Sequence, residues 1–202
     1  TIARVFRVLT IGDSFTEGQL VERIPPVPPS TTPTQVYSFA NPPYPEALET
    51  LLRADPRFGR TADVDNEGAS GECASIRGCS GNVTSGQSRI EALTTAKKYD
   101  VVIILEGFND LNAGGSLGGA IDALRFMGRT ARSSGATVLM GRIHVMRSDM
   151  WDQIRTMAGQ EQFARVDFDT RVQIGEDRVH PTQAGYETMA GFVFGAIRSL
   201  IP

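Results

Sequence analysis

The stretch Val101-Val-Ile-Ile-Leu105, followed directly by Glu106-Gly-Phe-Asn-Asp110, decides the fold of this chain. Five aliphatic residues in a row are typical of a strand that a sheet buries on both faces. Parallel sheets covered by helices bury their strands in this way, whereas half-exposed antiparallel strands alternate apolar and polar residues. The stretch therefore predicts a central strand of a parallel sheet, with residues 106–110 at its carboxyl end.

The rest of the chain alternates between strand-like and helix-like patterns around this strand. Strand patterns recur at residues 4–11, 61–66, 136–143 and 164–168, and helical spacing recurs at residues 45–54, 88–98, 118–134, 149–162 and 181–200. Strands that alternate with helices predict an α/β fold of three layers, with a five-stranded parallel sheet in flavodoxin-like order. We expect residues 1–202 to form a single domain.

One segment stands out by its prolines, because eight of the chain's 11 lie between residues 25 and 45. Proline removes a backbone donor and fixes its own φ, which disfavours both a helix and a central strand. The segment is therefore predicted to be an extended surface loop within the domain.

The composition excludes several classes of protein. Hydrophobic residues make up 41% of the chain and charged residues 21%, which excludes a disordered or fibrous chain. A net charge of −3 gives no basic surface for nucleic acid. The longest aliphatic run, Val101–Leu105, is far shorter than the roughly 18 residues of a membrane span. The composition leaves the oligomeric state open.

Polar residues follow four of the five predicted strands, where the carboxyl ends of parallel strands meet at one edge of the sheet. A serine hydroxyl becomes a good nucleophile when a neighbouring imidazole accepts its proton, and a carboxylate must then orient that imidazole. Ser14 follows the first strand, and Asp177 and His180 follow the fifth. The tetrahedral intermediate also needs donors for its oxyanion. The backbone amides of Ser14 and Gly71 and the side-chain amide of Asn109 could supply three.

Taken together, these segments resemble the SGNH (GDSL) hydrolases, which are serine esterases and lipases on a flavodoxin-like fold. The similar blocks are Gly12-Asp-Ser-Phe-Thr-Glu-Gly18, residues 66–71, Gly107-Phe-Asn-Asp110 and Asp177-Arg-Val-His180. The resemblance implies that Ser14 is the nucleophile, His180 the base and Asp177 the orienting acid. It also implies an oxyanion hole of Ser14, Gly71 and Asn109, with Gly68 as the alternative to Gly71.

Other residues near these blocks carry weaker expectations. Phe108 stands where many relatives carry a second glycine, and its ring would narrow the acyl site. His144, just past the fourth strand, is either a substrate contact or an ordinary partly exposed imidazole. Cys73 and Cys79 are expected to form a disulfide, the alternative being two free thiols. A disulfide would place the protein in a secreted or periplasmic setting, although a cytoplasmic one stays open. Two cysteines and two scattered histidines offer no metal-ligand spacing, and no cofactor is expected.

The expected activity is hydrolysis of a carboxylic ester through an acyl-enzyme, on short acyl chains or O-acetyl groups of carbohydrates. The expected partner is therefore a small-molecule or carbohydrate ester. Three alternatives stay open. Residues 25–45 could form an apolar lip for a lipid or lysophospholipid ester. The fold could carry a non-catalytic site that binds a sugar or an acyl group. The acyl group could also pass to an alcohol rather than to water.

Overall fold

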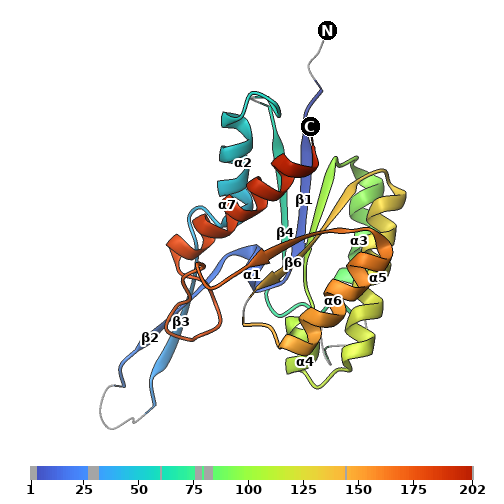
Figure 1. The fold of residues 1–202 in the computed structure, drawn as a ribbon. Coiled ribbons are helices and arrows are strands. Elements are labelled where there is room, and N and C mark those ends of the chain that lie inside the picture. Colours follow the sequence, from blue (N-terminus) through green and yellow to red (C-terminus); the bar gives the residue numbers. More distant parts are fainter. Residues whose placement is uncertain are drawn as a thin grey trace.

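A five-stranded parallel sheet forms the centre of the molecule in the computed structural model, which describes residues 4–26, 32–59, 61–75, 79, 84–143 and 145–201 (Figure 1). The spatial order is β4-β1-β5-β6-β7. These strands are β1 (Arg7–Gly12), β4 (Asp63–Gly68), β5 (Val101–Leu105), β6 (Thr137–Ile143) and β7 (Ala164–Phe168). The chain moves outward from β1 in both directions, which is the flavodoxin-like doubly wound order. The predicted fold class is therefore confirmed.

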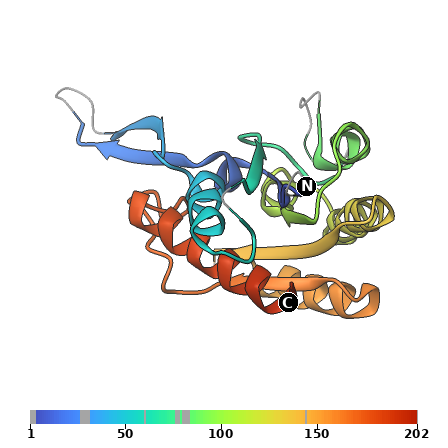
Figure 2. The same cartoon turned by 90° about the horizontal axis from the view of Figure 1, so that it is seen from above.

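Helices cover both faces of this sheet (Figures 1 and 2). One face carries α2 (Tyr44–Ala54) packed against α7 (Gln183–Leu200). The other face carries α3 (Gly86–Ala96), α5 (Leu117–Ser133) and α6 (Ser148–Glu161), with α5 between the other two. Within the described residues, no helix combines the length and apolarity that a membrane crossing requires. The bounds of these elements lie within three residues of the predicted ones.

The core is centred on β5, in which all five residues are buried. The strand lies between β1 and β6, so its side chains pack against helices on both faces. Burying an aliphatic side chain of this size stabilises the folded state by about 1.5–3 kcal/mol. This burial explains why an uninterrupted aliphatic run identifies the centre of the sheet.

The prediction that residues 25–45 form only an extended loop is wrong. The structure forms β2 (Gln19–Ile24) and β3 (Thr34–Phe39), an antiparallel hairpin outside the main sheet. This hairpin projects from the body of the molecule (Figure 2). Prolines 25 and 33 flank the two strands and none lies inside Thr34–Phe39, so the ladder keeps all of its donors. The prolines of residues 25–45 lie on either side of β3, so the high proline content of the whole segment does not apply to the strand itself.

Two short helices that were not predicted lie at the carboxyl edge of the sheet. They are α1 (Ser14–Glu17), directly after β1, and α4 (Phe108–Asn112), directly after β5. The turn into α4 depends on Gly107, whose φ of 102° is a left-handed conformation that side chains with a Cβ rarely adopt. Each helix therefore places a polar side chain, Ser14 or Asn109, above the edge of the sheet.

Candidate active site

Ser14 lies at the start of α1, with its hydroxyl directed at the ring of His180. The distance from Ser14 Oγ to His180 Nε2 is 2.9 Å, although the two residues are 166 positions apart in sequence. The position of Ser14 is held by Asp13, the N-cap of α1, whose Oδ1 accepts a hydrogen bond of 3.0 Å from the Phe15 amide. A neutral imidazole with an unprotonated Nε2 can accept the hydroxyl proton at this distance.

Asp177 orients the His180 ring from the opposite side. Its Oδ2 lies 2.5 Å from His180 Nδ1, and its Oδ1 accepts from the backbone amides of Val179 and His180, each at 3.0 Å. Burial opposes ionisation of Asp177, but the hydrogen bonds from the His180 ring and the two amides outweigh it and lower the pKa of this carboxyl. The ionised carboxylate holds the proton of the imidazole on Nδ1, which leaves Nε2 as the acceptor.

The loop that carries this pair is closed by backbone hydrogen bonds. The Gly175 amide donates to the His180 carbonyl at 2.7 Å, and the Thr182 amide donates to the Gln173 carbonyl at 2.9 Å. Thr182 then caps α7, with its Oγ1 accepting from the Gly185 amide. His180 therefore stands on a short loop pinned at both ends, and its ring has little freedom to turn away from Ser14.

Asn109 and Gly71, the other predicted oxyanion donors, lie on neighbouring loops. Asn109 Nδ2 donates to the Glu72 carbonyl at 2.9 Å and to Asp13 Oδ2 at 3.2 Å. Its amide therefore lies between α1 and the segment of residues 69–75 that follows β4, here called the Gly71 loop. Gly71 adopts a left-handed φ of 77°. The amide of the alternative, Gly68, donates to the Asn66 side chain at 3.1 Å. The choice of Gly71 over Gly68 as the backbone donor stays a prediction.

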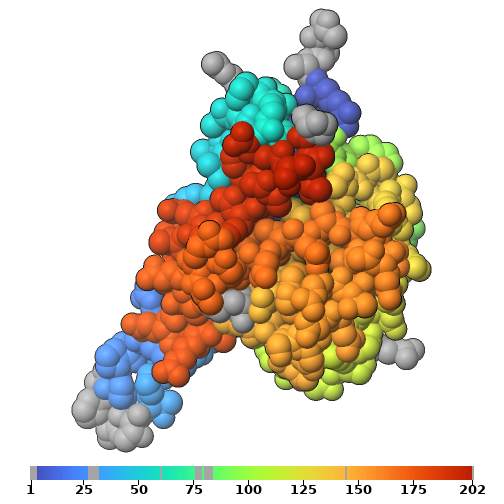
Figure 3. Space-filling view, in the orientation of Figure 1, coloured from blue at the N-terminus to red at the C-terminus, as the bar shows by residue number. Residues whose placement is uncertain are grey.

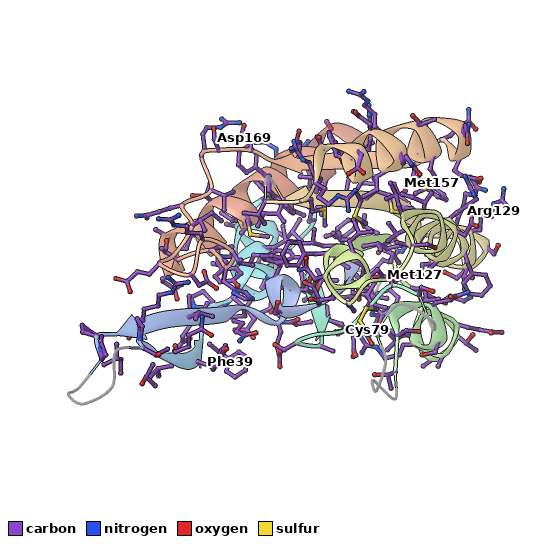
Figure 4. The ribbon with its side chains drawn as sticks, turned by 90° about the horizontal axis from the view of Figure 1, so that it is seen from below. Phe39, Cys79, Met127, Arg129, Met157 and Asp169 are labelled. Atoms are coloured by element: carbon purple, nitrogen blue, oxygen red, sulfur yellow. A yellow bond between two sulfur atoms is a disulfide. The ribbon has the colours of Figure 1, made fainter. Side chains whose placement is uncertain are left out.

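A disulfide joins Cys73 to Cys79, with Cα atoms 5.8 Å apart, at one end of the Gly71 loop (Figure 4). At the same end, the Asp110 carboxylate accepts from the backbone amides of Ala74 and Ser75, at 2.8 and 3.0 Å. Asp110 directly follows Asn109, so the same helix that carries the amide donor also anchors this loop. The sequence places Asp110 in a family-like block but does not reveal this contact.

The disulfide leads to a stability prediction. Replacing both Cys73 and Cys79 with serine is expected to lower the free energy of unfolding by about 2 kcal/mol, because the bond closes a ring of few residues and constrains the unfolded chain. Urea unfolding of the variant and the wild type under oxidising conditions measures the difference. An equal stability would contradict a bonded pair in the purified protein.

A layer of four buried acidic side chains lies beneath the site, namely Asp13, Glu72, Glu106 and Asp110. Arg89 forms an ion pair with Glu72 at 2.7 Å. Burial, together with the charges of Glu72 and Asp110, raises the pKa of Asp13 to about 7 against the opposing hydrogen bond from Phe15. Burial and the charges of Asp13, Glu72 and Asp110 raise the pKa of Glu106 well above its ordinary value. Sequence reasoning missed Glu72 and Glu106, although both directly adjoin residues of the predicted blocks.

These carboxyls make the stability of the protein depend on pH. A carboxyl whose pKa is raised by folding favours the folded state at low pH, and this contribution is lost as pH rises through the folded-state pKa. We therefore expect the melting temperature to fall from about pH 4 to about pH 7, the window between the ordinary pKa of an aspartate in the unfolded chain and the pKa of about 7 for Asp13 in the folded protein. Glu106→Gln, which cannot ionise, should flatten this dependence in thermal melts, with Asp152→Asn on the exposed face of α6 as the control. Parallel pH dependences for wild type and Glu106→Gln would contradict a raised pKa of Glu106.

Two further residues were predicted to touch substrate. Phe108, the first residue of α4, places its ring edge-to-face on Phe15, with centroids 5.4 Å apart, and Phe15 in turn lies 5.4 Å from the His180 ring. Its effect on the acyl site stays a prediction. His144 lies outside the described residues. In the part of the chain that the structure describes, no group of three or more acidic, histidine or cysteine side chains could hold a metal ion.

Several solved structures are similar to this one. The inhibitor-bound aryl esterase of M. smegmatis superposes with a TM-score of 0.76 at 17% identity, covering 97% of this chain and 100% of that chain. The carbohydrate acetylesterase Est24 of Sinorhizobium meliloti gives 0.69 at 16% identity, covering 96% and 99%. The esterase EstA of Pseudoalteromonas sp. gives 0.69 at 13% identity, covering 96% and 97%. At these identities the likeness shows a shared fold.

The sequence comparison extends over most of the chain. No curated protein matches the sequence. A sequence profile of the GDSL-like lipase/acylhydrolase family, however, matches residues 10–188, a range that includes Ser14, Gly71, Asn109, Asp177 and His180. The chain therefore belongs to the GDSL-like lipase/acylhydrolase family and is a carboxylic ester hydrolase.

Proposed function

We propose that the protein hydrolyses carboxylic esters through a covalent acyl-enzyme on Ser14. The observation that carries this proposal is the unbroken chain of hydrogen bonds from Ser14 Oγ through the His180 ring to Asp177, with distances of 2.9 and 2.5 Å. This arrangement matches the roles of nucleophile, general base and orienting carboxylate.

The reaction divides into two halves. Ser14 Oγ attacks the ester carbonyl carbon while its proton moves to His180 Nε2, and the imidazolium then protonates the leaving alcohol as the carbon–oxygen bond breaks. In the second half a water molecule gives a proton to His180 Nε2, attacks the acyl-enzyme and releases the acid. Ser14 recovers its proton, and Asp177 stays ionised throughout because its pKa is lowered.

The oxyanion of each tetrahedral intermediate would be bound by the backbone amides of Ser14 and Gly71 and by the Asn109 side-chain amide. To do so, the Asn109 amide would exchange its longer bond, of 3.2 Å to Asp13, for a bond to the substrate oxygen. Asn109→Ala is expected to lower kcat by about 10²–10³-fold with a smaller effect on KM, because the bond strengthens as charge develops on the oxygen. Steady-state kinetics with p-nitrophenyl acetate measures this loss. Asn112→Ala, on the exposed end of the same helix, serves as the control. A loss as large in KM as in kcat would contradict an oxyanion role.

We propose short acyl chains, including O-acetyl groups on carbohydrates, as the substrate class. The ring of Phe108 supports this proposal, because it packs on Phe15, which lies against His180, and a bulky side chain there leaves less space for a long acyl chain. A chain-length series of p-nitrophenyl esters, run beside acetylated xylan, provides the test. Rates that rise with chain length would instead indicate a lipid ester. The Cys73–Cys79 disulfide is compatible with a secreted or periplasmic location, which we also propose.

A further inference from the structure

The hairpin of β2 and β3, here called the arm, carries most of the exposed large hydrophobic side chains of the described residues. Six large hydrophobic side chains are exposed, and four of them, Ile24, Val36, Tyr37 and Phe39, belong to the arm. Tyr37 and Phe39 are 59% and 58% exposed. The arm projects beyond the body in the space-filling view (Figure 3), and Phe39 lies clear of the helices (Figure 4). A cluster of this kind marks an interaction surface more often than an isolated exposed residue does.

The two outer edges of the arm differ. The β2 edge faces the body, where the Arg23 amide donates to Glu176 at 3.2 Å and the Tyr186 hydroxyl donates to the Gln19 carbonyl at 2.7 Å. Among the described residues, β3 forms backbone hydrogen bonds only with β2 and the ladder contains no bulge. The outer backbone groups of β3 are therefore available to another strand.

The sequence of β3 contains none of the devices by which edge strands avoid pairing. Thr34-Gln-Val-Tyr-Ser-Phe39 has no charged residue and no proline, and all six residues are exposed. Natural edge strands are usually protected by lysine, proline, a bulge or a covering segment. A two-stranded hairpin is also only marginally stable in water by itself, so a further strand would stabilise the arm.

We propose that β3 pairs antiparallel with β3 of a second copy of this chain, forming a four-stranded sheet across a two-fold axis. An interface of this kind must be complementary to itself. The uncharged strand meets this condition, because two identical copies bring no like charges into opposition. Crossing at Tyr37 would place Val36 opposite Ser38 of the partner subunit and bring the aromatic side chains of both copies onto one face.

The placement of the apolar side chains favours another strand, rather than a lipid surface, as the binding partner of the arm. In the hairpin register, Tyr37 and Phe39 lie on one face of the arm, whereas Val36 and Ile24 lie on the other. A membrane surface would contact only one of these faces. Pairing along the β3 edge extends both faces of the hairpin. On each face, it brings apolar side chains of the two copies together.

The mass of the full chain in solution tests this proposal independently of any activity. Sedimentation equilibrium from about 1 to about 100 µM should show a dimer for the wild type and a monomer for Val36→Lys/Ser38→Lys, in which lysines of the two copies would face each other. Phe126→Lys, an exposed apolar residue on α5, should stay dimeric. Hydrolysis of p-nitrophenyl acetate within about twofold of the wild-type rate shows that the monomeric variant is folded.

Each other outcome counts against the proposal. A wild type that is monomeric over the whole range overturns it, as does a double lysine variant that stays dimeric. A monomeric wild type that binds phosphatidylcholine vesicles would assign the arm to a lipid surface instead. Tyr37→Cys is expected to crosslink to itself on mild oxidation, since the two native cysteines are already paired. A dimer that the lysines disrupt but that this cysteine does not crosslink would rule out the crossing at Tyr37.

Discussion

Ser14→Ala is expected to lower kcat for p-nitrophenyl acetate by about 10⁴–10⁶-fold, the range seen when the nucleophile of a catalytic triad is removed. Alanine removes the only hydroxyl within hydrogen-bond distance of His180 Nε2 among the described residues, so no acyl-enzyme can form on this side chain. Ser14 is the first residue of α1, and Asp13 caps that helix through the Phe15 amide rather than through Ser14. The fold should therefore persist, which far-ultraviolet circular dichroism would verify.

Covalent labelling separates this interpretation from that of a non-catalytic binding protein. A fluorophosphonate should add to Ser14 of the wild type and leave Ser14→Ala unmodified in intact-mass spectra. Ser133→Ala, which removes a surface hydroxyl on α5, should label and turn over like the wild type. Turnover of Ser14→Ala within tenfold of the wild type would contradict the assigned nucleophile.

Asp177→Asn is expected to lower kcat by about 10⁴-fold, although the substitution changes little in volume. In the wild type, Asp177 Oδ2 accepts a hydrogen bond from His180 Nδ1 at 2.5 Å. This bond stabilises the tautomer with the proton on Nδ1, which leaves Nε2 free to accept from Ser14. An asparagine can present its NH₂ group to Nδ1, which favours the opposite tautomer with the proton on Nε2. It also removes the negative charge that stabilises the imidazolium.

Steady-state kinetics from about pH 6 to about pH 9 would measure this loss, since the lowered pKa of Asp177 keeps the wild-type carboxylate ionised throughout. Asp167→Asn provides a matched control, because Asp167 is an exposed acid that pairs with Arg142 on the neighbouring strand. A loss of less than about tenfold, with the fold intact, would mean that the Asp177 carboxylate does not orient the base.

The parts of the site that could be predicted from the sequence are those formed by residues close together in the chain. Asp177 and His180 are three residues apart, and the backbone amides between them bond to the same carboxylate, so their proximity is built into a single turn. Likewise, Val101–Leu105 lacks any polar residue, and only a strand covered on both faces buries such a run without exposing apolar surface. The alternation of strands and helices then restricts the order of the sheet.

The features that the sequence did not reveal depend on contacts between distant segments. Glu72 and Glu106 look like ordinary charged loop residues, and they become buried only because the Gly71 loop folds onto α4 through Asp110. Thr34–Phe39 contains the β-branched and aromatic residues typical of a strand, but the prolines on either side of it favour a loop, so local composition does not predict this strand.

By itself, then, the sequence determined the α/β class, the family and the residue types that form the site, because hydrophobic periodicity and short motifs act over a few residues. The tertiary structure alone decided the distance between Ser14 and His180, the burial of the acidic layer and the exposed edge of β3. These three features depend on how segments far apart in the chain pack against one another, and a pattern of a few neighbouring residues does not predict that packing.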